Sequence, residues 1–308
     1  MVTLNNLIKR NVKLFFKDKG MLFTSLITPL ILLVLYITFL GNVYKSSFTA
    51  NIPEFIKIED SLINGLVGGQ LVSSLLSVSC ITVAFCSNFL MVQDKVSGVK
   101  KDLDITPVKK STLALSYYIS TFISTFIICI IAMMGGFIYL ACIGWYLSFG
   151  DILFIILDIF LLVLFGTALS SIINYFLTSQ GQISAVGTIV SACYGFICGA
   201  YMPISQFSPF LQKILSFLPG TYGTSLFRNH CINGVFREMS NNYYPSELIS
   251  GFRDTVDCNV YFFGNKVEIL PMYLYILLID IILVGIYVLL NFLNKKNKKN
   301  IFIAKIYK

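Results

Sequence analysis

The sequence has 308 residues, of which 56% are hydrophobic and only 12% are charged. Soluble domains carry about 25% charged residues, so a chain of this length with half that share cannot cover a water-facing surface, and the soluble enzyme classes are excluded. To interpret the net charge of +8, we therefore ask which side of a membrane carries the basic residues. We expect no nucleic-acid partner.

Residues 4–19 predict an amphipathic helix ahead of the first apolar run. Apolar residues recur at helical spacing from Leu4 to Phe16, and Lys9, Lys13 and Lys17 lie four residues apart on another face. This pattern is typical of a helix that lies in the membrane interface with its lysines toward anionic headgroups and its apolar side against lipid. A plain basic stretch beside the membrane is the alternative.

Six apolar segments are long enough to cross the hydrocarbon core, which takes about 20 helical residues. They cover residues 21–41, 62–92, 112–142, 152–177, 183–202 and 270–293. The sequence therefore predicts an all-α polytopic membrane protein in which residues 1–308 form a single transmembrane domain.

The segment 203–269, between the fifth and sixth spans, is the longest connection. Its first part predicts a short amphipathic helix bracketed by prolines, too short to span and similar to a re-entrant helix in or on the outer leaflet; its apolar residues are Phe210, Leu211, Ile214, Leu215 and Leu218. The remainder of the segment, which contains the one histidine, His230, is polar enough for us to expect an extracellular loop in water.

The basic residues set the orientation. Sixteen of the 23 Lys and Arg residues lie before the first span, in the loop 93–111 between the second and third spans, or after the last span. A six-span layout brings these three segments to one side, and the excess of positive charge predicts that this side, with both termini, is cytoplasmic.

Catalytic motifs are missing from the sequence. It contains no Gly-Lys dipeptide and therefore no phosphate-binding loop of the G-x-x-x-x-G-K-[ST] type, and its one histidine leaves little basis for a nucleophile system or a metal cluster. We expect no enzyme activity, no metal and no cofactor in this chain. Movement of a substrate fits such a membrane protein better than its conversion.

Three segments carry a resemblance to a known family. A basic amphipathic helix leads into the first span. The cytoplasmic loop contains an acidic-basic pair, a glycine, a leucine and Thr-Pro, which are Asp94, Lys95, Gly98, Leu103, Thr106 and Pro107. The fifth span ends in a glycine-rich stretch followed by Pro203, Leu218-Pro219, Tyr222 and Arg228. In this order, the pattern resembles the permease subunit of type-2 ABC exporters, such as bacterial multidrug and antimicrobial-peptide permeases.

The resemblance implies partners and a location. ATP and Mg would be held by a separate ABC ATPase subunit, present in two copies beneath two permease subunits that are identical or paralogous. The complex would lie in the cytoplasmic membrane of a bacterium, in contact with lipid, and would move an amphiphilic drug, antimicrobial peptide or lipid-like compound outward. The six loop residues from Asp94 to Pro107 would couple the ATPase to the permease; a solvated charged loop is the alternative.

The resemblance also places a substrate path along the first, second and fifth spans. Its candidate lining residues are Gln70, Phe85, Asn88, Phe89 and Thr188, although ordinary polar contacts between helices explain the polar members as well. Two acids lie within spans, Asp158 and Asp280. A carboxylate at the centre of a membrane helix costs about 2.5–3.5 kcal/mol. A site for a cation or a proton-coupled step is one interpretation, and a hydrogen bond between helices is the one we favour.

Six of the eight cysteines lie in apolar runs and are expected to act as small hydrophobic residues. Cys231 and Cys258 lie in the extracellular segment, where a disulfide between them would close a loop; free thiols are the alternative. Other functions that remain open are export of a polysaccharide or glycolipid, ATP-independent secondary transport, and a membrane enzyme or sensor.

Overall fold

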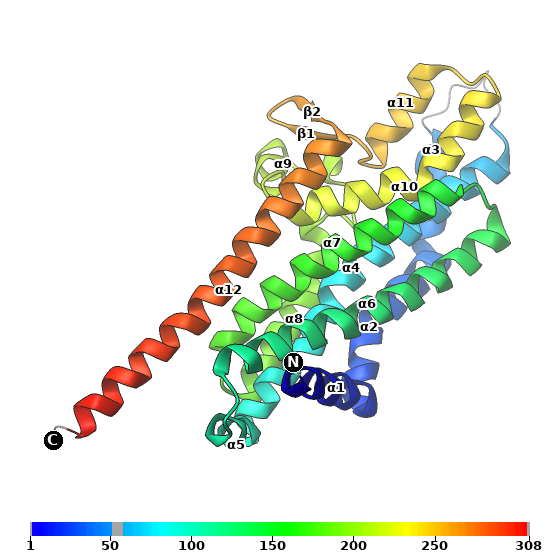
Figure 1. Ribbon diagram of the computed structural model, residues 1–308. Helices are drawn as coiled ribbons and strands as arrows, with labels where there is room; N and C mark the ends of the chain where they lie inside the picture. Colours follow the sequence, from blue (N-terminus) through cyan, green and yellow to red (C-terminus); the bar gives the residue numbers. More distant parts are fainter. Residues whose placement is uncertain (1, 51–57, 307–308) are drawn as a thin grey trace.

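The computed structural model describes residues 2–50 and 58–306, and it is built almost entirely of helices (Figure 1). The first elements are α1 (Val2–Lys17), α2 (Lys19–Leu35), the π-helical turn η1 (Tyr36–Leu40) and α3 (Gly41–Ala50). The predicted amphipathic helix is thus present as α1. It packs along α6 with Leu7, Asn11 and Phe15 buried, while its three lysines are exposed. Its apolar side therefore contacts the protein, in addition to any contact with lipid.

The first membrane helix continues further than predicted. The apolar run Lys19–Ser46 is one continuous helical segment that includes the π-helical turn. A π-turn inserts an extra residue into a helix and often marks a functional position. The connection predicted at 42–61 therefore begins as helix, and its residues 51–57 lie outside the described residues.

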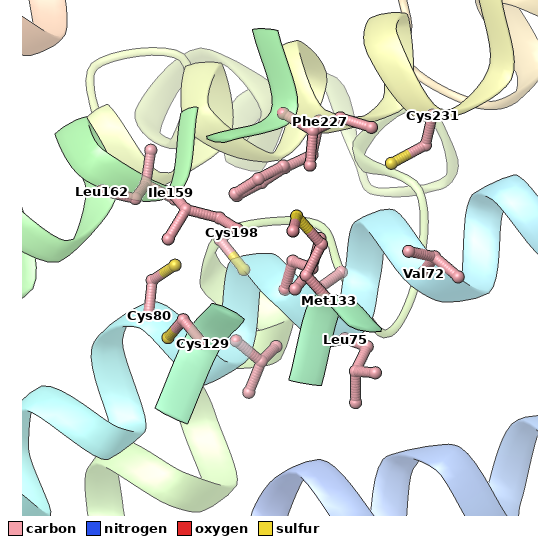
Figure 2. Close-up of a cluster of buried hydrophobic side chains, with 14 of the residues drawn as sticks. Val72, Leu75, Cys80, Cys129, Met133, Ile159, Leu162, Cys198, Phe227 and Cys231 are labelled. Carbon is pink, nitrogen blue, oxygen red and sulfur yellow. The ribbon is translucent and has the colours of Figure 1, made fainter. Parts of the chain in front are cut away.

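Helix α4 (Asp60–Val96) is the central helix of the molecule. It contacts α2, α6 (Lys110–Ile143), α7 (Phe149–Phe176), α8 (Gln180–Ile197) and α10 (Pro219–Asn241), and the apolar stretch that would cross the membrane is buried along its whole length. Figure 2 shows side chains of these helices meeting around α4, among them Leu75, Met133, Ile159 and Phe227. The neighbouring helices also enclose the polar residues of α4, such as Gln70, Ser77 and Asn88.

Five helical segments of the described residues are long and apolar enough to cross a membrane: Lys19–Ser46, Asp60–Val96, Lys110–Ile143, Phe149–Phe176 and Ile269–Phe292. The predicted fifth span, 183–202, corresponds to α8, whose apolar run is interrupted by Ser184, Gly187 and Thr188. It ends at Ile197, and the left-handed backbone of Gly199 (φ 77°) turns the chain away. The sixth crossing therefore stays a prediction.

The segment after α8 departs most from the sequence prediction. It forms η2 (Ile204–Gln206), α9 (Pro209–Leu215), α10, α11 (Ser246–Thr255), a hairpin of β1 (Val260–Phe262) and β2 (Asn265–Val267), and α12 (Ile269–Ile306). The predicted amphipathic helix is α9. The first half of the part expected in water is instead the buried helix α10, which packs against α4, α7 and α12. His230 lies on this helix and not in a loop.

The basic segments share one end of the molecule. Helices α1 and α5 (Val99–Ile105) and the far end of α12 lie at the lower end in Figure 1, whereas α3, α11 and the hairpin lie at the opposite end. This arrangement agrees with the predicted grouping of the basic residues. That this end is cytoplasmic stays a prediction.

Candidate functional site

The loop after α4 is anchored by Asp94, whose side chain is buried. Its carboxylate accepts two hydrogen bonds from the guanidinium of Arg10 on α1, at 2.9 and 3.1 Å, and one from the Tyr117 hydroxyl on α6 at 2.5 Å. The bond to Asp94 raises the pKa of Arg10 above its ordinary value. Asp94 thus holds α1, α4 and α6 together, and its part in coupling to an ATPase stays a prediction.

Lys95 also points into the protein. Its ammonium donates hydrogen bonds to the carbonyl oxygens of Asn174, Tyr175 and Leu177, at 2.9, 2.8 and 3.1 Å. These carbonyls end α7, where the last turn of a helix lacks intrahelical donors and attracts cations. Lys95 therefore caps α7, and the acidic-basic pair of the motif connects neighbouring helices.

Gly98 and α5 form the exposed part of the loop. Gly98 has a left-handed backbone (φ 87°), which costs other residues roughly 1–2 kcal/mol, and a side chain added there would enter open space. Leu103 packs on the small cluster formed by α1, α4 and α6, and the Thr106 hydroxyl donates to the Leu103 carbonyl at 2.6 Å. Pro107 is exposed.

The sequence interpretation missed Ile105, which ends α5. Its side chain is 86% exposed, the highest value among the large aliphatic residues in the described part of the chain. An apolar residue inside a strongly charged loop is the signal that identifies it. A partner protein that covers the end of α5 would bury this side chain.

A large groove runs beside α2, α4 and α8. Its volume is about 1090 Å³, and it is lined mostly by apolar side chains. Of the predicted path residues, Phe89 and Thr188 line it. Gln70 and Phe85 are buried and lie elsewhere, and Asn88 donates hydrogen bonds to the hydroxyls of Ser170 and Ser171 on α7. These three residues therefore lie outside the groove, and their place on a substrate path stays a prediction.

The groove has an apolar wall with scattered polar groups. No Lys or Arg is among the described residues that line it, and its one charged member, Asp18, accepts a hydrogen bond from the Met21 amide at the start of α2. Hydroxyl and amide groups come from Thr24, Thr28, Gln93, Ser184 and Ser191. This lining suits a ligand that is mainly apolar, with a neutral or cationic polar end.

The acid Asp158 forms hydrogen bonds between helices, as favoured from the sequence. Its fully buried carboxylate shares a hydrogen bond with Nδ1 of His230 at 2.6 Å and accepts one from the Tyr273 hydroxyl at 2.5 Å. One face of α7 also carries Asp151, which pairs with Arg237 at 2.6 Å. Both acids therefore attach α10 to α7.

Asp280 has a different environment. Its side chain is buried on α12, and neither carboxylate oxygen has a hydrogen-bond partner in the described structure. Neither Asp158 nor Asp280 lines the groove. Across the described residues, no group of three His, Cys, Asp or Glu side chains is placed to hold a metal ion.

Arg228 organises the turn after α8, although the sequence identified it only as a motif position. The guanidinium is buried on α10, pairs with Asp257 at 3.0 Å and donates to the Gly199 carbonyl at 2.5 Å. The hydroxyls of Tyr36 and Tyr44 donate to the carbonyls of Ala200 and Tyr201 at 3.2 and 3.4 Å. The first span and α10 therefore both hold the turn formed by residues 199–201.

Cys231 and Cys258 are free, buried thiols, so the disulfide weighed from the sequence is not formed in the structure. Burial raises the pKa of the Cys258 thiol to about 12.

Because the thiolate is the reactive form of a cysteine, we expect a water-soluble maleimide at about pH 8 to leave Cys231 and Cys258 unlabelled in the native protein and to label them after denaturation. Mass analysis of a Cys142→Ser, Cys193→Ser variant, which lacks the two exposed thiols, checks this; labelling of the native variant would contradict it.

Comparison with known proteins gives one match. The family model described as ABC-2 type transporter matches residues 3–230, which include α1, the loop with α5, all the helices that line the groove, and Arg228. No curated protein matches the chain. No solved structure matches it either.

Proposed function

Because the chain belongs to the ABC-2 type transporter family, which makes it a membrane permease component of an ABC transporter, we propose that it exports an amphiphilic compound. The groove beside α2, α4 and α8 is the observation that carries this proposal. Its size, apolar wall and lack of lining cations favour a drug, peptide or lipid-like molecule with a neutral or cationic polar end over a polyanion.

The proposal includes a second permease subunit, identical or paralogous. Strongly exposed apolar residues on α2, η1 and α8 lie in or beside the groove, including Phe23, Phe39, Ile189 and Phe196. An open apolar groove of this kind needs lipid or protein against it. A second subunit facing these helices would close the groove into a path across the bacterial cytoplasmic membrane.

The proposal also includes two copies of a separate ABC ATPase below α5. The exposed Ile105 and Pro107 support a contact there, whereas Asp94, Lys95 and Leu103 support the position of α5 from within the permease. Outward transport is what the resemblance to type-2 ABC exporters implies, and the basic residues predict only that α1 and α5 lie on the cytoplasmic side.

Filling the groove tests the proposed function. We expect Thr188→Trp to remove most of the transport of a fluorescent cationic amphiphile in proteoliposomes that contain the permease and its ATPase, because Thr188 lines the groove and is exposed in it. Ile131→Trp is the matched control, since Ile131 on α6 is exposed but lies outside the groove. Equal transport by both variants would contradict the assignment of the path.

A further inference from the structure

The hairpin before α12 carries an unusual turn. Strands β1 and β2 pair with Phe262 opposite Asn265, which leaves Phe263 and Gly264 as the two-residue loop. Both have positive φ, 50° and 86°, as a type I′ turn requires. Asn or Asp is the ordinary choice at the first position, and a bulky side chain there is strained. A phenylalanine at this strained position indicates that its exposed ring has a function.

The ring of Phe263 belongs to a larger cluster. Its centroid lies 4.9 Å from that of Phe262 and 5.9 Å from that of Phe217, and the latter two rings are 5.2 Å apart. Phe217 follows α9, where Phe210 and Ile214 precede it at helical spacing on the same side. All five are exposed, by 36% to 76%. We call these five residues the aromatic patch.

The aromatic patch continues the membrane-facing surface of α12. The last span begins directly after the hairpin, and its first residues, Ile269 and Leu270, are exposed. The Tyr275 hydroxyl on the first turns of α12 donates to the Phe217 carbonyl at 2.6 Å, which fixes the patch beside the upper end of the helix (Figure 1). Three exposed charges border the patch, Lys213, Lys266 and Glu268.

We infer that the aromatic patch inserts into the lipid leaflet at this end of the molecule, which is the outer leaflet in the proposed orientation. Its rings contact the upper acyl chains, and the two lysines lie at the phosphate level. Phospholipid is the occupant because the patch is continuous with the apolar face of a helix that spans the bilayer, and because apolar rings bordered by lysines match the headgroup boundary. The contact does not depend on what the permease transports.

A single tryptophan in the patch reports on this contact. The chain has one tryptophan, Trp145, so Phe263→Trp is made in a Trp145→Phe background and reconstituted in vesicles of phosphatidylcholine. Acyl chains brominated close to the headgroup are expected to quench most of its fluorescence, and acrylamide in the water little of it. Tyr243→Trp is the matched control, because Tyr243 is 95% exposed at the same end of the molecule and also has a positive φ, 58°.

The control tryptophan is expected to show the opposite pattern, with strong quenching by acrylamide and little by brominated lipid. Acrylamide quenching at position 263 would overturn the inference and place the hairpin in water. Protection of position 263 from both quenchers would also overturn it, because protein would then cover the patch. Phe217→Trp in the same background repeats the measurement away from the strained turn.

Discussion

Replacing Arg228 with methionine is expected to destabilise the protein by about 3–5 kcal/mol, the usual cost of removing one partner of a buried ion pair. The Arg228 side chain is 1% exposed and that of its partner Asp257 is 7% exposed. Without the guanidinium, the carboxylate would keep only the backbone amides of Ile204 and Ser205, at 2.5 and 3.3 Å. The Gly199 carbonyl would lose its bond from the same side chain.

Thermal unfolding of the protein in nanodiscs measures this effect. A loss of 3–5 kcal/mol lowers the midpoint by roughly 5–8 °C in a chain of this size. Lys45→Met is the matched control, because the Lys45–Asp60 pair joins side chains that are 40% and 82% exposed, and such pairs contribute about 0–1 kcal/mol.

A double variant, Arg228→Met with Asp257→Leu, separates charge from packing. Because it removes both charges, it is expected to recover part of the stability that the single variant loses. Equal midpoints for Arg228→Met and Lys45→Met would show that the buried pair does not hold the turn after α8.

Replacing Ile105 with aspartate is expected to weaken binding of the ATPase subunit roughly 30-fold, which corresponds to about 2 kcal/mol for a central interface residue. The side chain is 86% exposed, so the permease itself should unfold at the same temperature as before. Binding is measured between the permease immobilised in nanodiscs and the purified ATPase subunit proposed as its partner.

Tyr243→Asp is the control for the Ile105 experiment, since Tyr243 is also highly exposed but lies at the opposite end of the molecule. Unchanged ATPase affinity for Ile105→Asp would remove α5 from the interface. It would leave the groove and its proposed ligand untouched, so the two parts of the proposed function can fail separately.

Local patterns in the sequence predicted the elements whose signal lies within a single segment. The helical spacing from Leu4 to Phe16 predicted α1, the long apolar runs predicted the membrane helices, and the prolines around Phe210 predicted α9. In each case the signal is the periodicity of one segment, which is visible without knowing what the segment packs against.

The roles of single side chains depended on distant partners and could not be predicted in the same way. Asp94 finds Arg10, which is 84 positions away, and Lys95 finds the end of α7. Phe85 and Phe89 are four residues apart and were expected on one wall, but Phe85 packs inside while Phe89 reaches the groove. Which side of α4 faces the groove is decided by the neighbouring helices.

Helix α10 was missed because its buried hydrophobic residues alternate with buried polar ones, such as Thr224 and Asn229. Small residues let it approach its neighbours, and a Cβ at Gly234 would collide with the backbone of Tyr146. Its polar side chains are satisfied by other helices, as with His230 and Asp158. Sequence periodicity detects an apolar stripe beside a polar face, whereas α10 buries polar and apolar residues together.

The end of α4 is attached to two sides of the protein. Asp94 ties it to α1 and α6, and the next residue, Lys95, ties it to α7. Helix α5 begins four residues after Lys95, so a displacement of α5 would move both attachments together. A force on α5 would thus act on α1 and α6 through Asp94 and on α7 through Lys95.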